Sequence, residues 1–236
     1  LKEMAVLYGV NALSRVLEDA FRSEGVPYVV ARGTAFYARQ EIKQALSYLR
    51  LLVNPRDDVA FVRIINTPTR GIGATSISRL EHLARSRGLS LLGAISFVSK
   101  EQGFTQRAVT AMKKFAATCE QWQTDSQSEE SLTAASSLAD LVERIVRESG
   151  LEEFYSKNAG EDDLERLQNL EELVSAASDF EERIEEGEEA SPTPLHMLFS
   201  FLEHVALVSD ADAVDPENGA VTLMTLHAAK GLEFDF

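Results

Sequence analysis

The 236-residue sequence has very little cysteine and no long apolar run. The single cysteine, Cys119, excludes an internal disulfide and a metal site built from several cysteines. No apolar run reaches the roughly eighteen residues that a membrane-spanning helix requires, and no stretch has the charged, apolar and small-residue regions of a signal peptide. We therefore expect no membrane partner and a reducing, cytoplasmic setting.

Two motifs of nucleotide-hydrolysing proteins are also missing. The sequence contains no G-x-x-x-x-G-K-[ST] phosphate loop, whose backbone N–H groups would hold a triphosphate. No Asp-Glu pair follows an apolar strand, where a site that binds magnesium and activates water would need it. Since phosphoryl transfer requires these groups together, we expect no ATP hydrolysis by this chain alone.

The charge is unevenly distributed. The chain has 23 Lys and Arg against 38 Asp and Glu, a net charge of −15, which argues against a simple nucleic-acid binder. Residues 1–118 nevertheless hold 17 basic against 9 acidic residues, whereas residues 119–236 hold 6 against 29. We expect only the first half to face a polyanion, and we interpret the acidic half as a set of solvated helices.

The two ends of the chain have strand character. Apolar stretches predict strands at residues 4–8, 27–30 and 221–225. Residues 11–24 have apolar side chains at helical spacing; Asn11 or Ser14 would cap this helix and Gly25 would end it. A strand, a helix and a second strand in this order predict the start of an α/β unit with a parallel pair.

The middle of the chain is predicted to be helical. Apolar periodicity predicts helices at residues 40–52, 59–65, 76–87, 91–99, 104–122, 138–149, 164–186 and 195–208. Polar residues 124–131 predict a loop, and residues 209–219 an acidic link. The fold class expected is mixed and mostly α: a partial α/β domain of parallel strands, interrupted by a large all-helical insertion.

A short glycine-containing turn separates two of these predicted helices. Glycines on either side of one apolar residue allow a tight hairpin, whose backbone N–H groups and following helix N-terminus would suit a phosphate. Arg70 and Arg63 would add positive charge. The turn resembles the helix-hairpin-helix element of DNA-binding proteins, and the pentapeptide alone is equally consistent with an ordinary turn. Its residues are Thr69, Arg70, Gly71, Ile72 and Gly73.

A second candidate site follows the last predicted strand. Residues 225–233 read Thr-Leu-His-Ala-Ala-Lys-Gly-Leu-Glu and bring several polar side chains to the end of an apolar strand. The carboxyl end of a strand is where α/β sheets bind ligands. Lys230 could contact a phosphate and Glu233 a ribose hydroxyl.

Six strings in a consistent order give the chain a wider resemblance. It resembles the UvrD/Rep/PcrA group of superfamily 1 DNA helicases over nearly its whole length. The matching strings are residues 5–8 with 11 and 14–18, residues 36–37 with 39 and 41–43, residues 46–50, residues 66–68 with 70–73, residues 169–173, and residues 223–227 with 230–233.

The resemblance implies a role for each matched position. It implies single-stranded DNA contacts by Asn11, Arg15, Thr225 and His227. It implies nucleotide contacts by Lys230, Gly231 and Glu233, and duplex DNA contacts by the hairpin at 69–73. Gly9 and Val10 stand where the family usually has Arg-Thr, which puts a DNA contact there in question.

The resemblance also implies a domain division. Residues 1–39 and 219–236 would belong to the second RecA-like motor domain, and residues 40–218 would form the inserted helical subdomain, with a helix-hairpin-helix element near 66–80. The chain begins at Leu1 and ends at Phe236 within an apolar stretch, so we expect it to be part of a longer protein. The missing first RecA-like domain, with the family's arginine fingers, would lie outside it.

The implied function is ATP-dependent 3′-to-5′ DNA unwinding in repair or replication. ATP and Mg²⁺ would serve the whole protein, and neither is expected to bind this chain alone. Expected partners are single-stranded DNA, the duplex junction, the first motor domain and repair proteins. The alternatives are a catalytically inactive relative that binds DNA or protein, and the helicase part of a helicase-nuclease.

The remaining polar and aromatic residues suggest structural roles. His82, His196 and His204 lack metal-ligand spacing to acidic residues, so no metal site is predicted. Core packing is the expected role of Trp122, and packing in the core of the second strand is the expected role of the pair at 36–37. The acidic run at 181–189 is interpreted as a solvated helix end.

Overall fold

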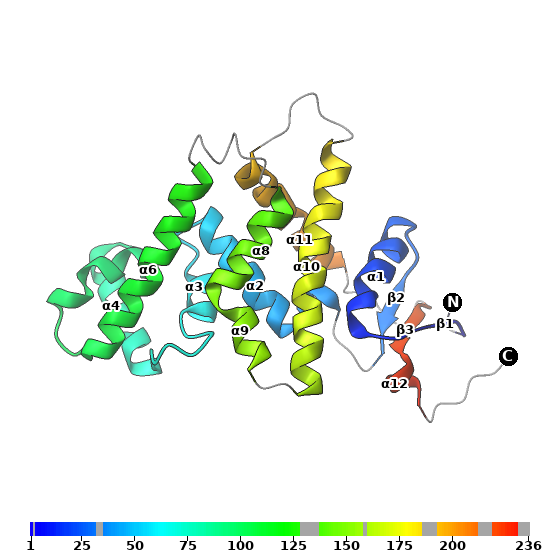
Figure 1. Cartoon of the computed structure of the whole chain (residues 1–236), viewed down its shortest axis with the longest axis horizontal. Coiled ribbons are helices and arrows are strands. Elements are labelled where there is room, and N and C mark those ends of the chain that lie inside the picture. The colour runs from blue at the N-terminus through cyan, green and yellow to red at the C-terminus, as the bar shows by residue number, and fades with distance from the viewer. Residues whose placement is uncertain are drawn as a thin grey trace.

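A computed structural model describes residues 1, 3–31, 35–127, 137–157, 160–185, 193–211 and 219–230. Within these ranges the chain is mostly helical and has one small parallel sheet (Figure 1). The predicted mixed, mostly α fold class with a helical insertion between strands is confirmed. No helix among these residues has both the length and the apolar character needed to cross a membrane.

The sheet consists of β1 (Ala5–Tyr8), β2 (Tyr28–Val30) and β3 (Val221–Thr225). Its order is β1-β3-β2 and both pairings are parallel. The first two strands are therefore parallel, as expected, but they do not pair directly because β3 lies between them. The central place of β3 agrees with its burial, because it is the most buried of the three strands.

The first helical segment comprises η1 (Asn11–Leu13) and α1 (Ser14–Ser23), and Gly25 follows with a φ of 64°. The predicted capping by Asn11 or Ser14 is wrong, because neither N-cap has a side-chain hydrogen bond. The Asn11 amide donates to Glu165 instead, and the Ser14 hydroxyl accepts from Arg39. Both side chains therefore form hydrogen bonds to distant parts of the chain and do not cap the helix.

All eight helices predicted for the middle of the chain are present, most of them with shifted boundaries. The helices observed after β2 begin with η2 (Phe36–Ala38), α2 (Gln40–Val53), α3 (Asp58–Ile64), α4 (Ala74–Arg87), α5 (Leu91–Ala94) and η3 (Ile95–Lys100). They continue with α6 (Gln106–Gln127), α8 (Leu138–Ser149), α9 (Leu151–Ser156), α10 (Glu161–Glu185) and α11 (Pro194–Ala211), and α12 (Leu226–Ala229) follows β3.

Three details of these helices differ from the predictions. The helix α9 is additional, and the predicted helix at 91–99 divides into α5 and the 3-10 helix η3. The predicted loop at 124–131 is helical as far as Gln127, because α6 continues through this polar stretch. The rest of that segment, and most of the predicted link at 209–219, lie outside the described residues.

Helix α2 is the centre of the helical part and packs against α3, α6, α8, α10 and α11. Its apolar side chains include Ile42, Leu49 and Leu51, all almost fully buried. Burying a side chain of this size contributes about 1.5–3 kcal/mol, so this helix accounts for much of the stability. Trp122 is only 4% exposed, which confirms its predicted packing role. Phe36 and Tyr37 are buried as well, but in this helical core and not in the cluster that contains the second strand.

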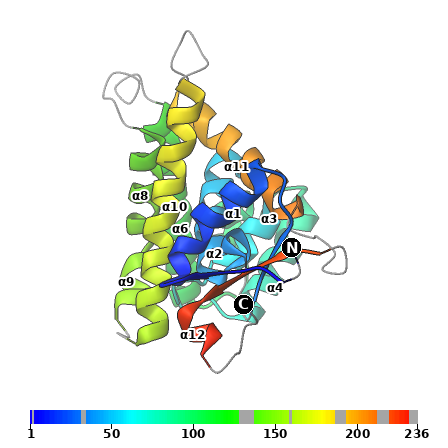
Figure 2. The same cartoon turned by 90° about the vertical axis from the view of Figure 1, so that its right-hand side faces the viewer.

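A second, smaller apolar cluster holds the sheet and α1 together. Its buried members are Tyr8, Val221 and Leu223, and side chains of α1 and β2 pack against them. Helix α1 lies between the strands and α10 (Figures 1 and 2). The two apolar clusters are separate, and hydrogen bonds and ion pairs join α1 to α10.

Candidate nucleic-acid interface

The carboxyl ends of β1 and β3 lie side by side at one end of the sheet. We call this end, with the residues that follow Tyr8 and Thr225, the sheet edge. Thr225 is in register with Tyr8, so the two strands finish side by side. The Thr225 hydroxyl accepts a hydrogen bond of 3.0 Å from the Ala228 N–H and thereby caps α12. His227 and Lys230 are exposed on and just after this short helix. The structure thus brings three of the predicted residues to one edge; Gly231 and Glu233 lie outside the described residues.

Asn11 begins the segment that leaves the same edge after β1. Its side-chain amide donates a hydrogen bond of 2.5 Å to Glu165 of α10, and its carbonyl oxygen accepts from Arg39 at 3.1 Å. Both hydrogen bonds therefore tie Asn11 to the helical part of the chain. Since Asn11 is only half-buried, its predicted DNA contact stays a prediction.

Arg15 is placed differently from the exposed residues of the sheet edge. Its side chain is 5% exposed and forms ion pairs with Asp19 at 3.1 Å, Glu172 at 2.5 Å and Asp179 at 2.8 Å. Burial alone would lower the pKa of the Arg15 guanidinium, but the hydrogen bonds to Glu172 and Asp179 outweigh it and raise the pKa. In this conformation Arg15 links α1 to α10 and has no free edge for a DNA strand.

A buried polar network lies beside this ion-pair cluster. Arg39 donates to the Ser14 hydroxyl at 2.5 Å and to the Asn169 side chain at 2.8 Å. The Asn169 amide in turn donates to Glu41 at 2.6 Å. Sequence reasoning did not identify this network, although its four residues all lie within the strings that carry the family resemblance.

The side chain of Asn66 closes the hairpin between α3 and α4. The Asn66 carboxamide oxygen accepts hydrogen bonds from the Arg70 N–H at 2.8 Å and the Ile72 N–H at 3.2 Å. Ile72 is 1% exposed and anchors the turn in the core, whereas Gly71 has a φ of 75° that favours glycine. Asn66 is another functional position that the pentapeptide pattern did not reveal.

Three hairpin residues face the surroundings: Thr69, Gly71 and Gly73 are exposed. Gly73 precedes α4, and this helix start has no side-chain cap. The first N–H groups of an α-helix have no acceptor within the helix, so they are available to an anion here.

Arg70 does not extend from the hairpin as the prediction required. Its guanidinium donates to four oxygen atoms at 2.7–3.1 Å, and it lies over the ring of Phe115. The four acceptors are the carbonyl oxygens of Ile64, Pro68 and Ser149 and the hydroxyl of Tyr48. With its donors occupied in this way, Arg70 fastens the hairpin to the body of the protein and offers little to a phosphate.

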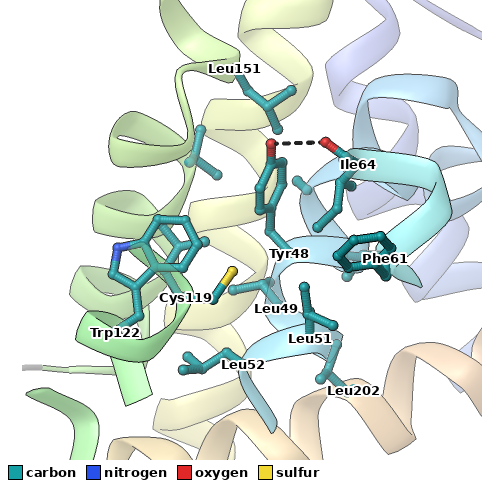
Figure 3. Close-up of a cluster of buried hydrophobic side chains, with 14 of the residues drawn as sticks. Tyr48, Leu49, Leu51, Leu52, Phe61, Ile64, Cys119, Trp122, Leu151 and Leu202 are labelled. Atoms are coloured by element: carbon teal, nitrogen blue, oxygen red, sulfur yellow. Dashed lines mark hydrogen bonds between the residues drawn. The ribbon is translucent and has the colours of Figure 1, made fainter. Parts of the chain in front are cut away.

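The aromatic cluster beneath the hairpin surrounds the single cysteine (Figure 3). The Tyr48 hydroxyl points toward the Ile64 carbonyl oxygen, 3.5 Å away, and Cys119 lies near the Trp122 ring. Burial raises the pKa of the Cys119 thiol to about 12 and that of Tyr48 to about 12. A thiol protonated at neutral pH is a poor nucleophile, so this cluster is structural.

Of the three histidines considered as metal ligands, His82 lies on α4, and His196 and His204 lie on α11. Among the residues that the structure describes, no three His, Cys, Asp or Glu side chains gather as a metal ion would require. Burial lowers the pKa of His204, whose ring lies against Phe180.

The two candidate regions lie at opposite ends of the molecule. The sheet edge is at one end and α4, with the hairpin before it, is near the other (Figure 1). A parallel sheet with polar residues at its carboxyl edge, interrupted by a helical body with an exposed hairpin, is the arrangement that the resemblance to superfamily 1 helicases implies.

Comparison with known proteins identifies the class. The family described as "UvrD-like helicase C-terminal domain" matches residues 1–236, and the chain belongs to this family. DNA helicase II of Escherichia coli is 42% identical over 234 residues, covering 99% of this chain and 31% of the relative. ATP-dependent DNA helicase PcrA of Staphylococcus epidermidis is 36% identical over 235 residues, covering 98% of this chain and 30% of the relative. The chain thus spans about a third of these relatives.

Proposed function

We propose that this chain is the DNA-handling part of an ATP-dependent 3′-to-5′ DNA helicase. The observation that carries the proposal is the family match over the whole chain, to a family named for helicases. The relatives carry the names DNA helicase II and ATP-dependent DNA helicase PcrA. The two alternatives, an inactive binding relative and a helicase-nuclease, have no observation in their favour.

The single-stranded DNA contacts are assigned to the sheet edge. His227 is exposed and Thr225 stands at the end of β3, with Asn11 leaving the neighbouring strand. The Thr225 hydroxyl accepts from the backbone and still has its own hydrogen to donate to a phosphate oxygen. Arg15 would join this set only if its ion pairs to α10 were broken.

The nucleotide contacts are assigned to the same edge, at Lys230 and, beyond the described residues, Gly231 and Glu233. The exposed Lys230 ammonium suits a phosphate or ribose oxygen of ATP. The described residues supply no carboxylate cluster for Mg²⁺, and the sequence has no phosphate loop. Other parts of a longer protein would therefore hold the Mg²⁺ and the triphosphate, and this chain alone would not hydrolyse ATP.

The domain division is part of the proposal. Residues 1–39 and 219–236 would belong to the second RecA-like domain and residues 40–218 to the inserted subdomain. The two separate apolar clusters support such a division. Phe36 and Tyr37 pack in the larger cluster, which favours moving the first boundary to just before Phe36.

The hairpin is proposed to contact duplex DNA ahead of the motor, through the exposed Thr69, Gly71 and Gly73 and the start of α4. Ile72 and Arg70 support the turn from within. The remaining partners proposed are the first RecA-like domain, the single-strand–duplex junction and repair proteins, in the cytoplasm where bacterial DNA lies.

A binding experiment tests the assignment of the sheet edge. We expect the chain to bind a duplex with a 3′ single-stranded tail more tightly than the same duplex with blunt ends, at low salt. His227→Ala should remove most of this difference, because it removes a group at the proposed strand contact. His82→Ala, on the exposed face of α4, is the matched control and should retain it. Equal affinity for tailed and blunt duplexes would contradict the proposed function.

A further inference from the structure

Two arginines outside the hairpin lie flat against glycines, one of them in the hairpin and the other just before α6. A methyl group on the Cα of Gly71 would lie 2.8 Å from Arg107 Nε and 3.1 Å from both Cζ and Nη2. A methyl group on Gly103 would lie 3.0 Å from Arg79 Cζ and 3.1 Å from both Nε and Nη1. Because Cζ is about as close as the nitrogens, each guanidinium group meets its glycine with its face and not with its edge.

This packing leaves the hydrogen-bond donors of both arginines available. The N–H groups of a guanidinium lie in its plane, so a face held against a glycine leaves them directed sideways. Both side chains are exposed, and neither forms an ion pair or side-chain hydrogen bond with any residue that the structure describes. Arg70 is the opposite case, since four protein oxygens occupy its donors.

The two arginines lie along one boundary on the surface, between the hairpin with α4 and the start of α6, which we call the seam. Arg107 lies in the first turn of α6 and reaches the hairpin at Gly71, while Arg79 on α4 reaches Gly103, just before α6. Each side chain therefore crosses between the hairpin–α4 unit and the start of α6. Glu101, the acidic residue nearest in sequence to Gly103, pairs with Arg87 at 2.8 Å and does not neutralise either arginine.

The glycines are part of this arrangement. A side chain at Gly71 or Gly103 would occupy the space in which the guanidinium group now lies, in addition to straining a backbone with a φ of 75° or 96°. Holding a long side chain in one orientation before a ligand arrives lowers the entropy cost of binding. Stacked, unpaired guanidinium groups suit the paired oxygens of phosphodiesters better than an ammonium would.

We propose that Arg107 and Arg79 bind the phosphate backbone of duplex DNA, and that Arg70 holds the fold of the hairpin without touching the DNA. The proposal rests on the proposed function for the identity of the anion. It extends the duplex-binding region from the hairpin across the seam to the start of α6.

Duplex binding by the 236-residue chain tests the two arginines directly. The dissociation constant for a blunt duplex would be measured between about 50 and 200 mM salt, for the chain and for Arg107→Ala, Arg79→Ala and Arg85→Ala. Arg85 is an equally exposed arginine further along α4 and is the matched control. Circular dichroism and urea unfolding would confirm that each variant is folded.

Each seam variant should weaken duplex binding several-fold at low salt and reduce the slope of log K against log salt by about 0.9, the value expected for one lost phosphate contact. Arg85→Ala should leave the slope unchanged. An unchanged slope in both seam variants would overturn the proposal, as would a loss confined to a single-stranded oligonucleotide or a duplex affinity too weak to measure.

The tailed duplex separates this proposal from the proposed function. Seam variants that bind both duplexes more weakly but still prefer the tailed one support both proposals. If the seam variants still prefer the tailed duplex and bind both duplexes as tightly as the parent chain, the proposed phosphate contacts of Arg107 and Arg79 are refuted and the proposed function is not. Weakened duplex binding without any preference for the tail refutes the function and supports the seam.

Discussion

Replacing Arg70 by alanine should destabilise the protein by a predictable amount. The guanidinium joins the hairpin to two other parts of the chain, through the Tyr48 hydroxyl at 2.7 Å and the Ser149 carbonyl at 3.0 Å. A hydrogen bond to a charged group contributes about 1.5–3 kcal/mol, and bonds that share one side chain do not add fully. Counting only these two bonds, at the lower value, predicts a loss of about 3 kcal/mol in the free energy of unfolding.

Trp122 provides the assay. It is the only tryptophan, is buried, and its ring centroid lies 6.0 Å from that of Tyr48, so its fluorescence should report unfolding of this cluster. With a urea dependence of about 2–3 kcal/mol per molar, the midpoint of Arg70→Ala should fall by about 1 M.

Arg107→Ala is the control for Arg70→Ala, because it removes an exposed arginine that contacts the same hairpin. It should change the free energy of unfolding by no more than about 0.5 kcal/mol. The reasoning is refuted if the two variants unfold at the same urea concentration, or if Arg70→Ala keeps the stability of the parent chain.

Three further predictions concern other parts of the molecule. Arg15→Ala should reduce the free energy of unfolding by about 3 kcal/mol in urea unfolding, since three carboxylates lose their buried partner; a change below 0.5 kcal/mol would contradict this role. The pKa of Cys119 is raised from 9.0 to about 12, so the unfolded chain releases this proton first and stability falls as pH rises above about 9. Cys119→Ala should show a smaller fall between about pH 8 and 10 in the same assay, and an identical fall would argue against the buried thiol. Gly71→Ala and Gly88→Ala should each cost about 1 kcal/mol at a positive φ, but only Gly71→Ala should weaken duplex binding, because nothing lies near Gly88.

Local patterns in the sequence predicted the helices well. Helix α8 begins and ends at the predicted residues, because its apolar face is periodic, Ser137 caps its start and Gly150 follows its end. The order of the strands could not be predicted in the same way. The pairing of β3 between β1 and β2 depends on contacts across nearly the whole chain, which periodicity does not encode.

The sequence predicted which segments form the candidate sites. It did not predict whether each side chain in them is exposed or hydrogen-bonded within the protein. The exposed residues Thr69, Gly71 and His227 could be recognised by their motifs. The resemblance implied DNA contacts by Arg15 and Arg70, but carboxylates and carbonyl oxygens from distant segments accept hydrogen bonds from their guanidinium groups. Those partners become visible only when the fold brings the segments together.

The hairpin also shows why a sequence motif does not include every residue that we propose to bind DNA. Arg107 lies far from the Thr-Arg-Gly-Ile-Gly string in sequence, and only its packing on Gly71 connects the two. A single sequence contains no signal for such a contact, apart from the excess of basic residues in its first half.

DNA unwinding by a hybrid protein tests the central claim most directly. This chain would replace the matched stretch of Escherichia coli DNA helicase II, which is 42% identical to it. We predict that the hybrid hydrolyses ATP and unwinds a duplex with a 3′ single-stranded tail but not one with a 5′ tail. A folded hybrid that hydrolyses ATP in the presence of DNA without separating the strands would contradict the account.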